Sequence, residues 1–359
     1  MATDVAIEKK PINISSQFYF KQFQLENEIT KALTSAGFFD INKVSNEFFV
    51  FDLSKSYWHD LGTLLWFISL LHKLKKQGND IQLILPEPQE KKGELVWNFL
   101  NRWRFFETLS VCVDDPVNLL QPRQIYLMGK QGKYSLAIRK DEYGKETFLH
   151  SLRLLEITTI LPSADKSPHD SLGDFLTKYS DKIILAALSK LCGWDNSITK
   201  NFIQLVFIEG LQNTLLHSEG SFSNVSMELD KKNLNLVISD NGIGIPKVLR
   251  SAFKANKINK DLLHKSDVDL IKYFTEPDMV LDSRMIKISV EKGITTQPGR
   301  KGLGLYYLKS LVLGQGGELR IRSGKACIDF TKSNEEPKDN LLDSPGTMLR
   351  IRTPLRKDI

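Results

Sequence analysis

The sequence predicts an α/β protein of two domains. Three observations lead to this prediction: a length of 359 residues, strands that alternate with helices over residues 47–113, and a loop-like cluster at residues 162–171. A chain this long exceeds one ordinary hydrophobic core, and its 41% hydrophobic and 26% charged residues are typical of globular folds. The cluster "PSADKSPHDS" is rich in Pro, Ser and Asp, which favours a domain boundary there.

The composition indicates a soluble protein of a reducing compartment. The net charge of +6 comes from Lys and Arg that are spread along the chain, so nucleic acid is not indicated as a partner. Cys112, Cys192 and Cys327 are far apart and form no CxxC pair, which argues against a disulfide framework or a zinc site and favours the cytoplasm. The N-terminus lacks the apolar run of a signal peptide, and Leu61–Leu74 is too short to span a bilayer, so no membrane contact is expected.

The first elements of the chain form a strand–helix–strand pattern. Residues 1–44 are expected to be a polar arm with a short helix. The compact apolar run Glu47–Ser54 predicts a buried strand, and Ile81–Pro86 predicts a second. Between them Asp60–Lys76 is a dense apolar helix, which Gly78 would end as a C-cap.

The pattern continues to about residue 165. Lys91–Leu109 is expected to be a second helix and Ser110–Val113 a further strand, which completes a βαβ arrangement. Lys133–Lys140 and Leu154–Pro162 resemble two more strands. We therefore assign residues 45–165 to one α/β domain with extra strands.

The second domain is expected over residues 171–359. Two helices between residues 172 and 217 are broken at Gly193–Ser197, where Asp195 or Asn196 would cap the second. A long loop-rich region ends near Pro298, and a helix follows with glycines at both ends. The sequence predicts five strands and this last helix: 224–230, 233–240, 318–323, 326–331 and 347–354, with the helix at 302–317.

A polar stripe runs along the segment "EGLQNTLLHS". Glu209, Asn213 and His217 are four residues apart, so on a helix they share one face. A solvent-exposed face would have the same spacing. A carboxylate with an amide one turn away also suits a magnesium–phosphate site, because the amide oxygen is a hard metal ligand and the carboxylate can orient or deprotonate a nucleophile. The residues alone leave both interpretations open.

Two glycine-containing segments follow. "DNGIGIP" comes directly after a strand, so Asp240 lies at the strand end, and Gly242 and Gly244 allow the backbone to approach a ligand; an ordinary tight turn has the same residues. "GRKGLGL" opens a helix, and its glycines with Arg300 and Lys301 suit a phosphate site or, equally, a flexible loop.

Taken together, these segments resemble the GHKL ATPase superfamily, the ATP-binding domain of histidine kinases, DNA gyrase, Hsp90 and MutL. The four boxes stand in family order: "EGLQNTLLH", "DNGIGIP", "GRKGLGLYYLKSLV" and "GTMLRIRTPL". The resemblance covers about residues 171–356, and its third box is most similar to histidine kinases. It implies a two-layer α/β sandwich, the Bergerat fold, for the C-terminal domain.

The resemblance also implies roles for single residues. Glu209 would be the general base or would position water, and Asn213 would bind the Mg²⁺ that bridges the phosphates of ATP. Asp240 would accept from the adenine amino group, with Thr347 helping through a water. The other implied nucleotide-binding residues are His217, Gly242, Gly244, Lys301, Gly302, Leu303 and Gly304.

The chain departs from the family pattern at two places. Leu216 stands where kinases often have a basic residue, which puts one phosphate contact in doubt. The region 246–298 is longer than a typical kinase lid, with room for an extra helix such as Lys265–Phe274. Thr295 and Thr296 mark the hinge of this lid or are ordinary loop threonines.

A histidine kinase also needs a phosphoacceptor histidine on a dimerising helix. His150, in "FLHSLRLLEITTI", is a candidate acceptor. The run is rich in β-branched residues, which favours a strand, and the stretch from His150 to Asn213 is too short for a helical hairpin plus the opening of the domain. An autokinase that uses His150 is therefore the third of our hypotheses.

The N-terminal half resembles a STAS domain, the fold of anti-sigma-factor antagonists, over residues 45–113. The strand ending in "DLS", the turn "HDLGT" and "GNDIQLILP" fit this pattern, although any small βαβ domain would be similar. Phosphorylated members have a Ser just before the glycine of the turn, where this chain has Leu61, so that switch is expected to be absent. Thr63 is expected to pack or to cap.

These resemblances imply an Mg-ATP-binding protein that hydrolyses ATP or transfers the γ-phosphate to a partner protein in bacterial-type signalling. It would be an ATPase or a protein kinase of the GHKL type. The alternative is a non-catalytic, ATP-gated interaction switch. The expected cofactors are ATP and Mg²⁺, the expected partner is a protein bound through the STAS-like half, and a homodimer stays open.

Overall fold

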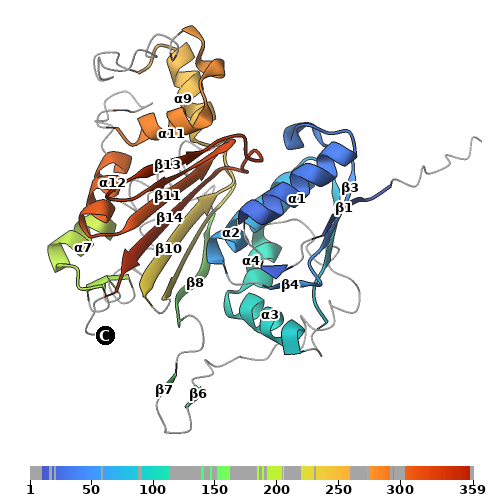
Figure 1. Ribbon diagram of the computed structural model, residues 1–359, viewed down its shortest axis with the longest axis horizontal. Coiled ribbons are helices and arrows are strands. Elements are labelled where there is room, and N and C mark those ends of the chain that lie inside the picture. Colours follow the sequence, from blue (N-terminus) through green and yellow to red (C-terminus); the bar gives the residue numbers. More distant parts are fainter. Residues whose placement is uncertain are drawn as a thin grey trace, which may run out of the picture. The chain divides into compact units, whose positions relative to one another are not determined.

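Two compact units make up the computed structural model of the chain, residues 1–135 and residues 136–359, and each is described by itself (Figure 1). The structure describes residues 10–15, 18–19, 22–57, 60–87, 91–112, 139–140, 146–147, 152–161, 184–185, 188–189, 192–203, 205, 220–229, 232–258, 273, 275–291, 294 and 304–355.

A small parallel sheet lies at the centre of the N-terminal unit. Its strands β1 (Ile12–Ser15), β3 (Phe48–Asp52) and β5 (Asp80–Ile84) lie in this order, each parallel to the next. Parallel neighbours need crossover connections, and these contain the helices α1 (Gln22–Ser35) and α2 (Leu61–Lys76). The predicted βαβ arrangement is confirmed, with one more βαβ unit on its N-terminal side.

Residues 1–44 are not only the polar arm and short helix that the sequence predicts. Ile12 and Ile14 of β1 are buried in the sheet, and α1 is 14 residues long. A second short parallel pair joins β2 (Phe18–Tyr19) to β4 (Ser56–Tyr57). The prediction fails because β1 has four residues and only two apolar positions, so its strand character depends on β3, more than 30 residues away.

The helix α2 begins and ends as predicted. The Asp60 carboxylate caps it by accepting from the Thr63 backbone N–H at 2.9 Å. The Thr63 side chain is fully buried, and its hydroxyl also donates to Asp60. Gly78 follows the helix with a φ of +79°. Thr63 therefore packs in the core and donates to the capping carboxylate, in line with the expected packing or capping role.

The segment after β5 differs from the prediction of one helix followed by a strand. It forms two helices, α3 (Lys91–Arg102) and α4 (Phe105–Cys112), which are separated at Arg104, where φ is +56°. The strand predicted at Ser110–Val113 is wrong, because α4 continues to Cys112, the last described residue of this segment. A run of four residues is too short for periodicity to separate strand from helix. The buried apolar side chains of α4 recur at helical spacing: Phe105, Phe106, Leu109 and Cys112.

A 3₁₀ turn, η1 (Ile41–Lys43), precedes β3.

A seven-stranded antiparallel sheet forms the C-terminal unit and confirms the mixed α/β class (Figure 1). The predicted strands near residues 224, 233, 318, 326 and 347 are all present. The order across the sheet is β13 (Glu335–Lys338), β12 (Ala326–Phe330), β11 (Glu318–Ser323), β14 (Thr347–Pro354), β10 (Asn233–Asp240), β9 (Ser223–Leu229) and β8 (Leu152–Ile160).

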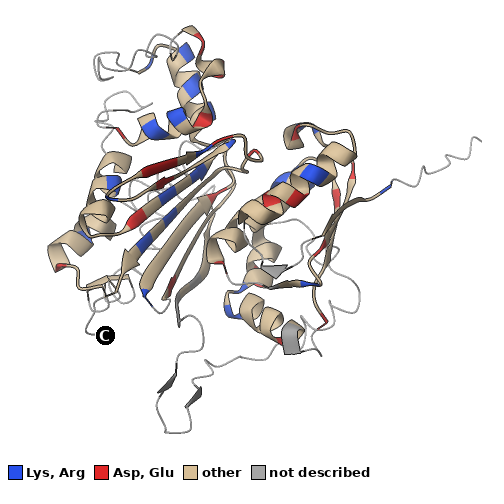
Figure 2. Cartoon of the chain, viewed as in Figure 1, with Lys and Arg blue, Asp and Glu red and all other residues tan. Residues whose placement is uncertain are grey.

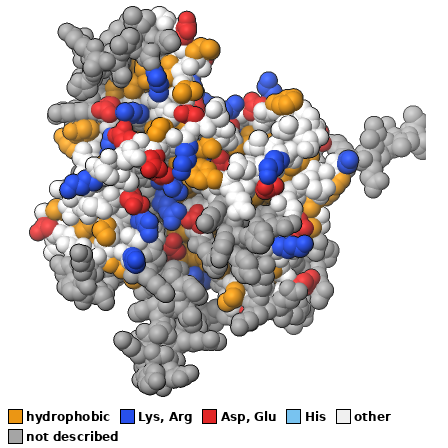
Figure 3. Space-filling model, viewed as in Figure 1, with side chains coloured by type: hydrophobic (Ala, Val, Ile, Leu, Met, Phe, Trp, Pro, Cys, Tyr) orange, Lys and Arg blue, Asp and Glu red, His pale blue; other side chains and the backbone are white. Residues whose placement is uncertain are grey.

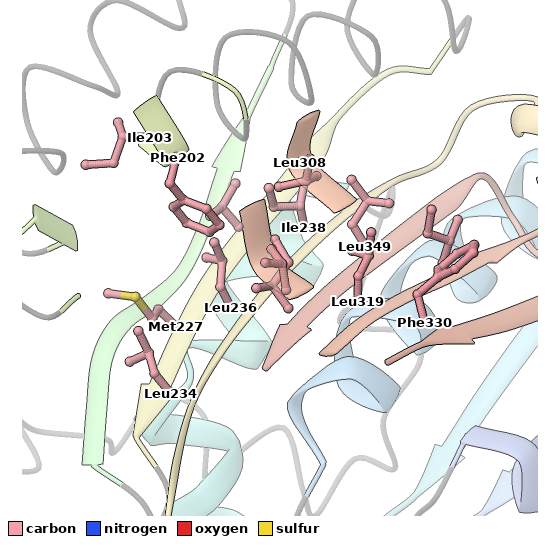
Figure 4. Close-up of a cluster of buried hydrophobic side chains, with 14 of the residues drawn as sticks. Phe202, Ile203, Met227, Leu234, Leu236, Ile238, Leu308, Leu319, Phe330 and Leu349 are labelled. Carbon is pink, nitrogen blue, oxygen red and sulfur yellow. The ribbon is translucent and has the colours of Figure 1, made fainter. Parts of the chain in front are cut away.

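One face of this sheet is covered by helices, among them α7 (Asn196–Ile203) and α12 (Gly304–Gly314), as Figure 1 shows. Asp195 caps α7, as predicted, by accepting from the Ser197 hydroxyl at 2.6 Å and from the Ser197 backbone N–H at 2.7 Å. These hydrogen bonds, the one from the hydroxyl most, lower the pKa of the Asp195 carboxyl. The apolar side chains between the helices and the sheet form the main core, and Figure 4 labels ten of them: Phe202, Ile203, Met227, Leu234, Leu236, Ile238, Leu308, Leu319, Phe330 and Leu349.

The strand β8 belongs to the C-terminal sheet, whereas the sequence analysis assigns Leu154–Pro162 to the N-terminal domain. It pairs antiparallel with β9, and its Leu155 and Ile160 side chains enter the main core. Local composition correctly predicts a strand after His150 but not which sheet receives it, because that choice depends on partners about 70 residues away. His150 itself lies outside the described residues.

A short pair, β6 (Arg139–Lys140) and β7 (Glu146–Thr147), precedes β8. Of the strand predicted at Lys133–Lys140, the structure describes only Arg139 and Lys140, which form β6. The rest of that prediction lies outside the described residues.

The region expected to be an enlarged lid contains a folded body of its own. The helices α9 (Ile245–Lys254) and α11 (Asp282–Ser289) and the 3₁₀ turn η7 (Pro277–Met279) enclose a second apolar cluster. Its buried members are Leu249, Ala252, Phe253, Ile258, Tyr273, Val280, Met285, Ile288 and Ile294. The helix predicted at Lys265–Phe274 lies outside the described residues except for Tyr273.

Arg250 holds this body together. Its guanidinium donates to the carbonyl oxygens of Pro277 at 3.0 Å and Val280 at 2.6 Å, and it forms an ion pair with Asp282. The Asp282 carboxylate also accepts from the backbone N–H of Lys325, in the turn between β11 and β12, at 2.5 Å. One carboxylate therefore joins α9, α11 and the turn between β11 and β12 of the main sheet.

We expect Asp282→Asn to destabilise the protein by about 2 kcal/mol, because the partly buried guanidinium of Arg250 loses its counter-charge. Asp278→Asn is the matched control, since its ion pair with Lys254 is more than half exposed on both sides and should be worth less than about 1 kcal/mol. Urea unfolding of both variants measures the difference. Equal losses in the two variants would contradict the role given to Asp282.

Charged side chains of both signs lie on the strands β11, β12, β13 and β14 of the C-terminal sheet (Figure 2). Arg320 forms an ion pair with Asp329, which also lies 3.5 Å from Lys338, and Arg352 lies 3.8 Å from Glu318. In the view of Figure 3, basic and acidic groups accordingly lie next to one another. This mixture agrees with the spread of charge along the sequence.

Candidate functional site

Asp240 is the last residue of β10, a strand flanked by β9 and β14 within the sheet. Side chains alternate along a strand, so Asp240 lies on the same face as Leu234, Leu236 and Ile238, the face that the helices cover. Its side chain is only 2% exposed. A carboxylate in this position is costly, because burial disfavours its charged form.

Backbone N–H groups partly offset this cost. The Oδ1 atom of Asp240 accepts from Gly242 at 2.8 Å and from Thr347 at 3.2 Å. Burial is the larger effect and raises the pKa of the Asp240 carboxyl to about 7, while the two hydrogen bonds act in the opposite direction. Both hydrogen bonds are accepted by the same oxygen, Oδ1. Within the described part of the chain, Oδ2 accepts no hydrogen bond.

Two glycines allow three segments of backbone to meet at Asp240. Gly346 has a φ of +100°, and a Cβ there would lie 2.6 Å from Asp240 Oδ1 and even closer to the carbonyl oxygen of the same residue. Gly244 has a φ of +83°, and a Cβ there would lie 2.8 Å from Ser323 Oγ. Both positions combine a left-handed backbone with a close approach, so only glycine fits.

Ser323 completes the cluster from the end of β11. Its hydroxyl accepts from the Ile245 backbone N–H at 2.9 Å and lies 3.0 Å from the Thr347 hydroxyl. It thereby joins the loop after β10 to the start of β14. We call Asp240, Gly242, Gly244, Ser323, Gly346 and Thr347 the Asp240 site.

The structure brings together four of the predicted site residues: Asp240, Gly242, Gly244 and Thr347. Gly304 is buried as the first residue of α12. The other predicted site residues lie outside the described part of the chain: Glu209, Asn213, His217, Lys301, Gly302 and Leu303. The predicted hinge residues Thr295 and Thr296 lie outside it too, and the roles of all these residues stay predictions.

Two residues of the site were given no role by the sequence analysis, although Gly346 opens the fourth box. Ser323 looks like an ordinary strand end, and only its register opposite Thr347 brings it to the site. Gly346 directly precedes Thr347, and a glycine before a strand that follows a polar loop was an available signal. Asn241 has a structural role, because its Oδ1 accepts from the backbone N–H groups of Ser221 and Phe222 and thus fixes the start of β9.

No cluster of three or more His, Cys, Asp or Glu side chains suited to a metal ion occurs among the described residues. Asn213, the predicted magnesium ligand, lies outside them, so the structure does not test that prediction. The acceptor that Asp240 presents does suit an organic ligand. A carboxylate oxygen with a free acceptor position matches a ligand N–H group such as the amino group of adenine.

The comparison with protein families matches residues 199–357 to the family described as "Histidine kinase-, DNA gyrase B-, and HSP90-like ATPase". The C-terminal part of the chain carries a GHKL-type ATPase domain. The match covers less than half of the chain, so it identifies this domain and not the whole protein. All six residues of the Asp240 site lie within the GHKL domain.

The solved structures that match include the mycobacterial sensor histidine kinase MprB, at 21% identity, with 45% of this chain and 74% of that chain covered. The TM-score is 0.23, too low for an argument about fold or activity. The curated proteins compared with the chain gave no match. The likeness of the N-terminal unit to STAS domains stays a prediction. Among the described helices, none has the length and apolar character needed to cross a membrane.

Proposed function

We propose that the GHKL domain binds Mg-ATP and hydrolyses it or transfers its γ-phosphate to a partner protein in bacterial-type signalling. One observation supports this most strongly: Asp240 is a buried carboxylate with one oxygen occupied by backbone N–H groups. The other oxygen is left to accept from the amino group of adenine. An acceptor atom without a partner, on a side chain that is otherwise buried, favours a ligand that supplies the missing donor.

Further roles follow the resemblance of the boxes. Glu209 would orient or deprotonate the nucleophile, Asn213 would hold Mg²⁺, and Lys301 with the following glycine-containing segment would meet the phosphate oxygens. Bound Mg²⁺ would supply the charge that neutralises these oxygens. Thr347 would assist Asp240 in holding the base. His217 would contact a phosphate or lie at the rim of the site.

For the N-terminal unit we propose a STAS-like, partner-binding role. The three parallel strands and the buried crossover helix α2 support it. Thr63 is fully buried, so regulation would come from nucleotide state rather than from phosphorylation at that residue. A cytoplasmic location fits the three free cysteines; burial raises the pKa of Cys192 and Cys327 to about 12, which keeps these thiols protonated.

We expect the purified chain to bind ATP with magnesium and to release phosphate or to label a partner when it is given γ-labelled ATP. In Glu209→Gln, binding should persist within about threefold, because the amide keeps the shape of the side chain. Turnover should fall by about 100-fold or more, as is usual when a general base is lost. The assay follows free phosphate, label on the chain and label on co-purified proteins.

Glu318→Gln serves as the matched control, because Glu318 is an exposed residue at the start of β11 and should leave turnover unchanged. If Glu209→Gln binds ATP and turns it over like the wild type, the non-catalytic switch replaces the enzyme. Acid-labile label on His150 would instead indicate the autokinase. Absence of any affinity for adenine nucleotides would overturn the proposal.

A further inference from the structure

Ser323 makes three hydrogen-bonding contacts although it has a single hydroxyl. The side chain is fully buried at the end of β11. Its Oγ lies 2.9 Å from the Ile245 backbone nitrogen, 3.3 Å from the Gly346 carbonyl oxygen and 3.0 Å from Thr347 Oγ1. A serine hydroxyl offers one donated bond and two accepting lone pairs, so these three contacts use its full capacity.

Only one arrangement of protons satisfies all three contacts. The Ile245 N–H can only donate and the Gly346 carbonyl can only accept, so the single Ser323 proton points at Gly346. The contact with Thr347 then needs the Thr347 hydroxyl as the donor. The Thr347 proton is therefore directed at Ser323, and the remaining positions on Thr347 Oγ1 are lone pairs.

This arrangement has a chemical consequence for the Asp240 site. Thr347 Oγ1 and, in its ionised form, Asp240 Oδ2 both present only acceptors to a ligand. The two residues are directly linked, since the Thr347 backbone N–H donates to Asp240 Oδ1 at 3.2 Å. Acceptors favour a base edge with an amino group and disfavour one with a carbonyl, because two acceptors cannot pair. Adenine has an amino group at C6, where guanine has a carbonyl.

We infer that Ser323 determines base specificity: by taking the hydroxyl proton of Thr347, it keeps the Thr347 oxygen an acceptor and makes the GHKL domain select adenine over guanine nucleotides. This inference rests on the proposed nucleotide binding and extends it to a residue that is not expected to touch the base. Ser323 is thus a positioning residue that acts through Thr347.

The test compares the dissociation constants of ATP and GTP in Ser323→Ala and in the wild type, by calorimetry with magnesium. Without Ser323, the Thr347 hydroxyl can rotate and donate to a carbonyl. We expect ATP to bind about five- to tenfold more weakly, GTP to bind no more weakly, and the ATP/GTP preference to fall by about tenfold. Ser226→Ala is the matched control, because Ser226 is equally buried and its hydroxyl donates to Leu155 at 2.8 Å on the other face of the sheet.

A purely structural role would lower the affinities for ATP and GTP together and leave their ratio unchanged, in Ser323→Ala as in Ser226→Ala. Thr347→Val and Thr347→Ser test the same inference without altering Ser323. The first should lower the ATP/GTP preference, and the second should retain it because the hydroxyl stays. If wild-type protein binds ATP and these variants keep its preference, the inference is wrong and the proposed function stands. If the wild type binds neither nucleotide, both are overturned.

Discussion

Replacing Asp240 by Asn is expected to abolish ATP binding and to make the protein more stable above pH 7. The two backbone N–H groups at Oδ1 will orient the new amide with its oxygen toward them. The amide NH₂ group then stands where Oδ2 stood, and it opposes the amino group of adenine with a second donor. We expect at least a 100-fold loss of affinity, since the site is left with an unpaired buried polar group.

The stability change follows from the pKa of Asp240, which burial raises from its ordinary 3.8 to about 7. Between these values the folded protein holds a proton that the unfolded chain has lost, so the free energy of unfolding falls as the pH rises from about 4 to 7. This loss of stability is absent below pH 4 and complete above pH 7, where it reaches roughly 4 kcal/mol as an upper bound. Asn cannot ionise, so the Asp240→Asn variant does not lose stability in this way.

Urea unfolding of the wild type and of Asp240→Asn at pH 5 and pH 8 measures this effect. The stability of the variant relative to the wild type should be higher at pH 8 than at pH 5. Asp329→Asn, which removes a carboxylate paired with Arg320 on the same sheet, should leave ATP binding intact. The same pKa predicts that wild-type ATP affinity weakens below pH 7, because the protonated carboxyl is a poorer acceptor. A stability difference that does not change with pH would contradict the assignment of a raised pKa to Asp240.

Replacing Gly346 by Ala is expected to be the most damaging small substitution in the GHKL domain. The added methyl group would lie 2.6 Å from Asp240 Oδ1, and a φ of +100° is unfavourable for alanine. The start of β14 must then move away from Asp240, which breaks the Thr347 hydrogen bond. We expect a loss of about 3 kcal/mol or more in stability and no measurable ATP binding.

Gly316→Ala separates backbone strain from steric conflict. Gly316 has a φ of +72°, but a Cβ there would meet no atom within 4 Å. Its loss should be about 1 kcal/mol, with ATP binding retained. Thermal unfolding compares the stability of the two variants and calorimetry compares their ATP affinity, so together they separate backbone strain from steric conflict. Similar behaviour of the two alanine variants would mean that the close approach of Gly346 to Asp240 is unimportant.

The elements that sequence analysis predicted well are those with strong local signals. The helix α2 is apolar over four turns and has a capping Asp60, so neither its existence nor its ends depend on distant residues. β10 and the glycines after it are also defined within one short segment, which is why Asp240 could be proposed from the sequence. The GHKL boxes are local patterns of the same kind. For Glu209 and Asn213, the assignment still depends on that pattern alone.

The predictions that failed concern pairing between distant segments. β1 and β8 are short or ambiguous by themselves, and each becomes a strand of a particular sheet only through a partner that the local sequence does not specify. The strand predicted at Ser110–Val113 failed for a related reason. Its short apolar run suits a strand or a helix until burial in the core selects one, and here residues 110–112 belong to α4.

The sequence by itself therefore determined the kind of domain and the carboxylate at the end of β10, because both are encoded in contiguous residues. Only the tertiary structure decided what surrounds that carboxylate. Thr347 reaches Asp240 across 107 residues, and Ser323 reaches Ile245 across 78. Such contacts follow from strand order and register, which depend on the burial of the whole sheet and not on any one segment.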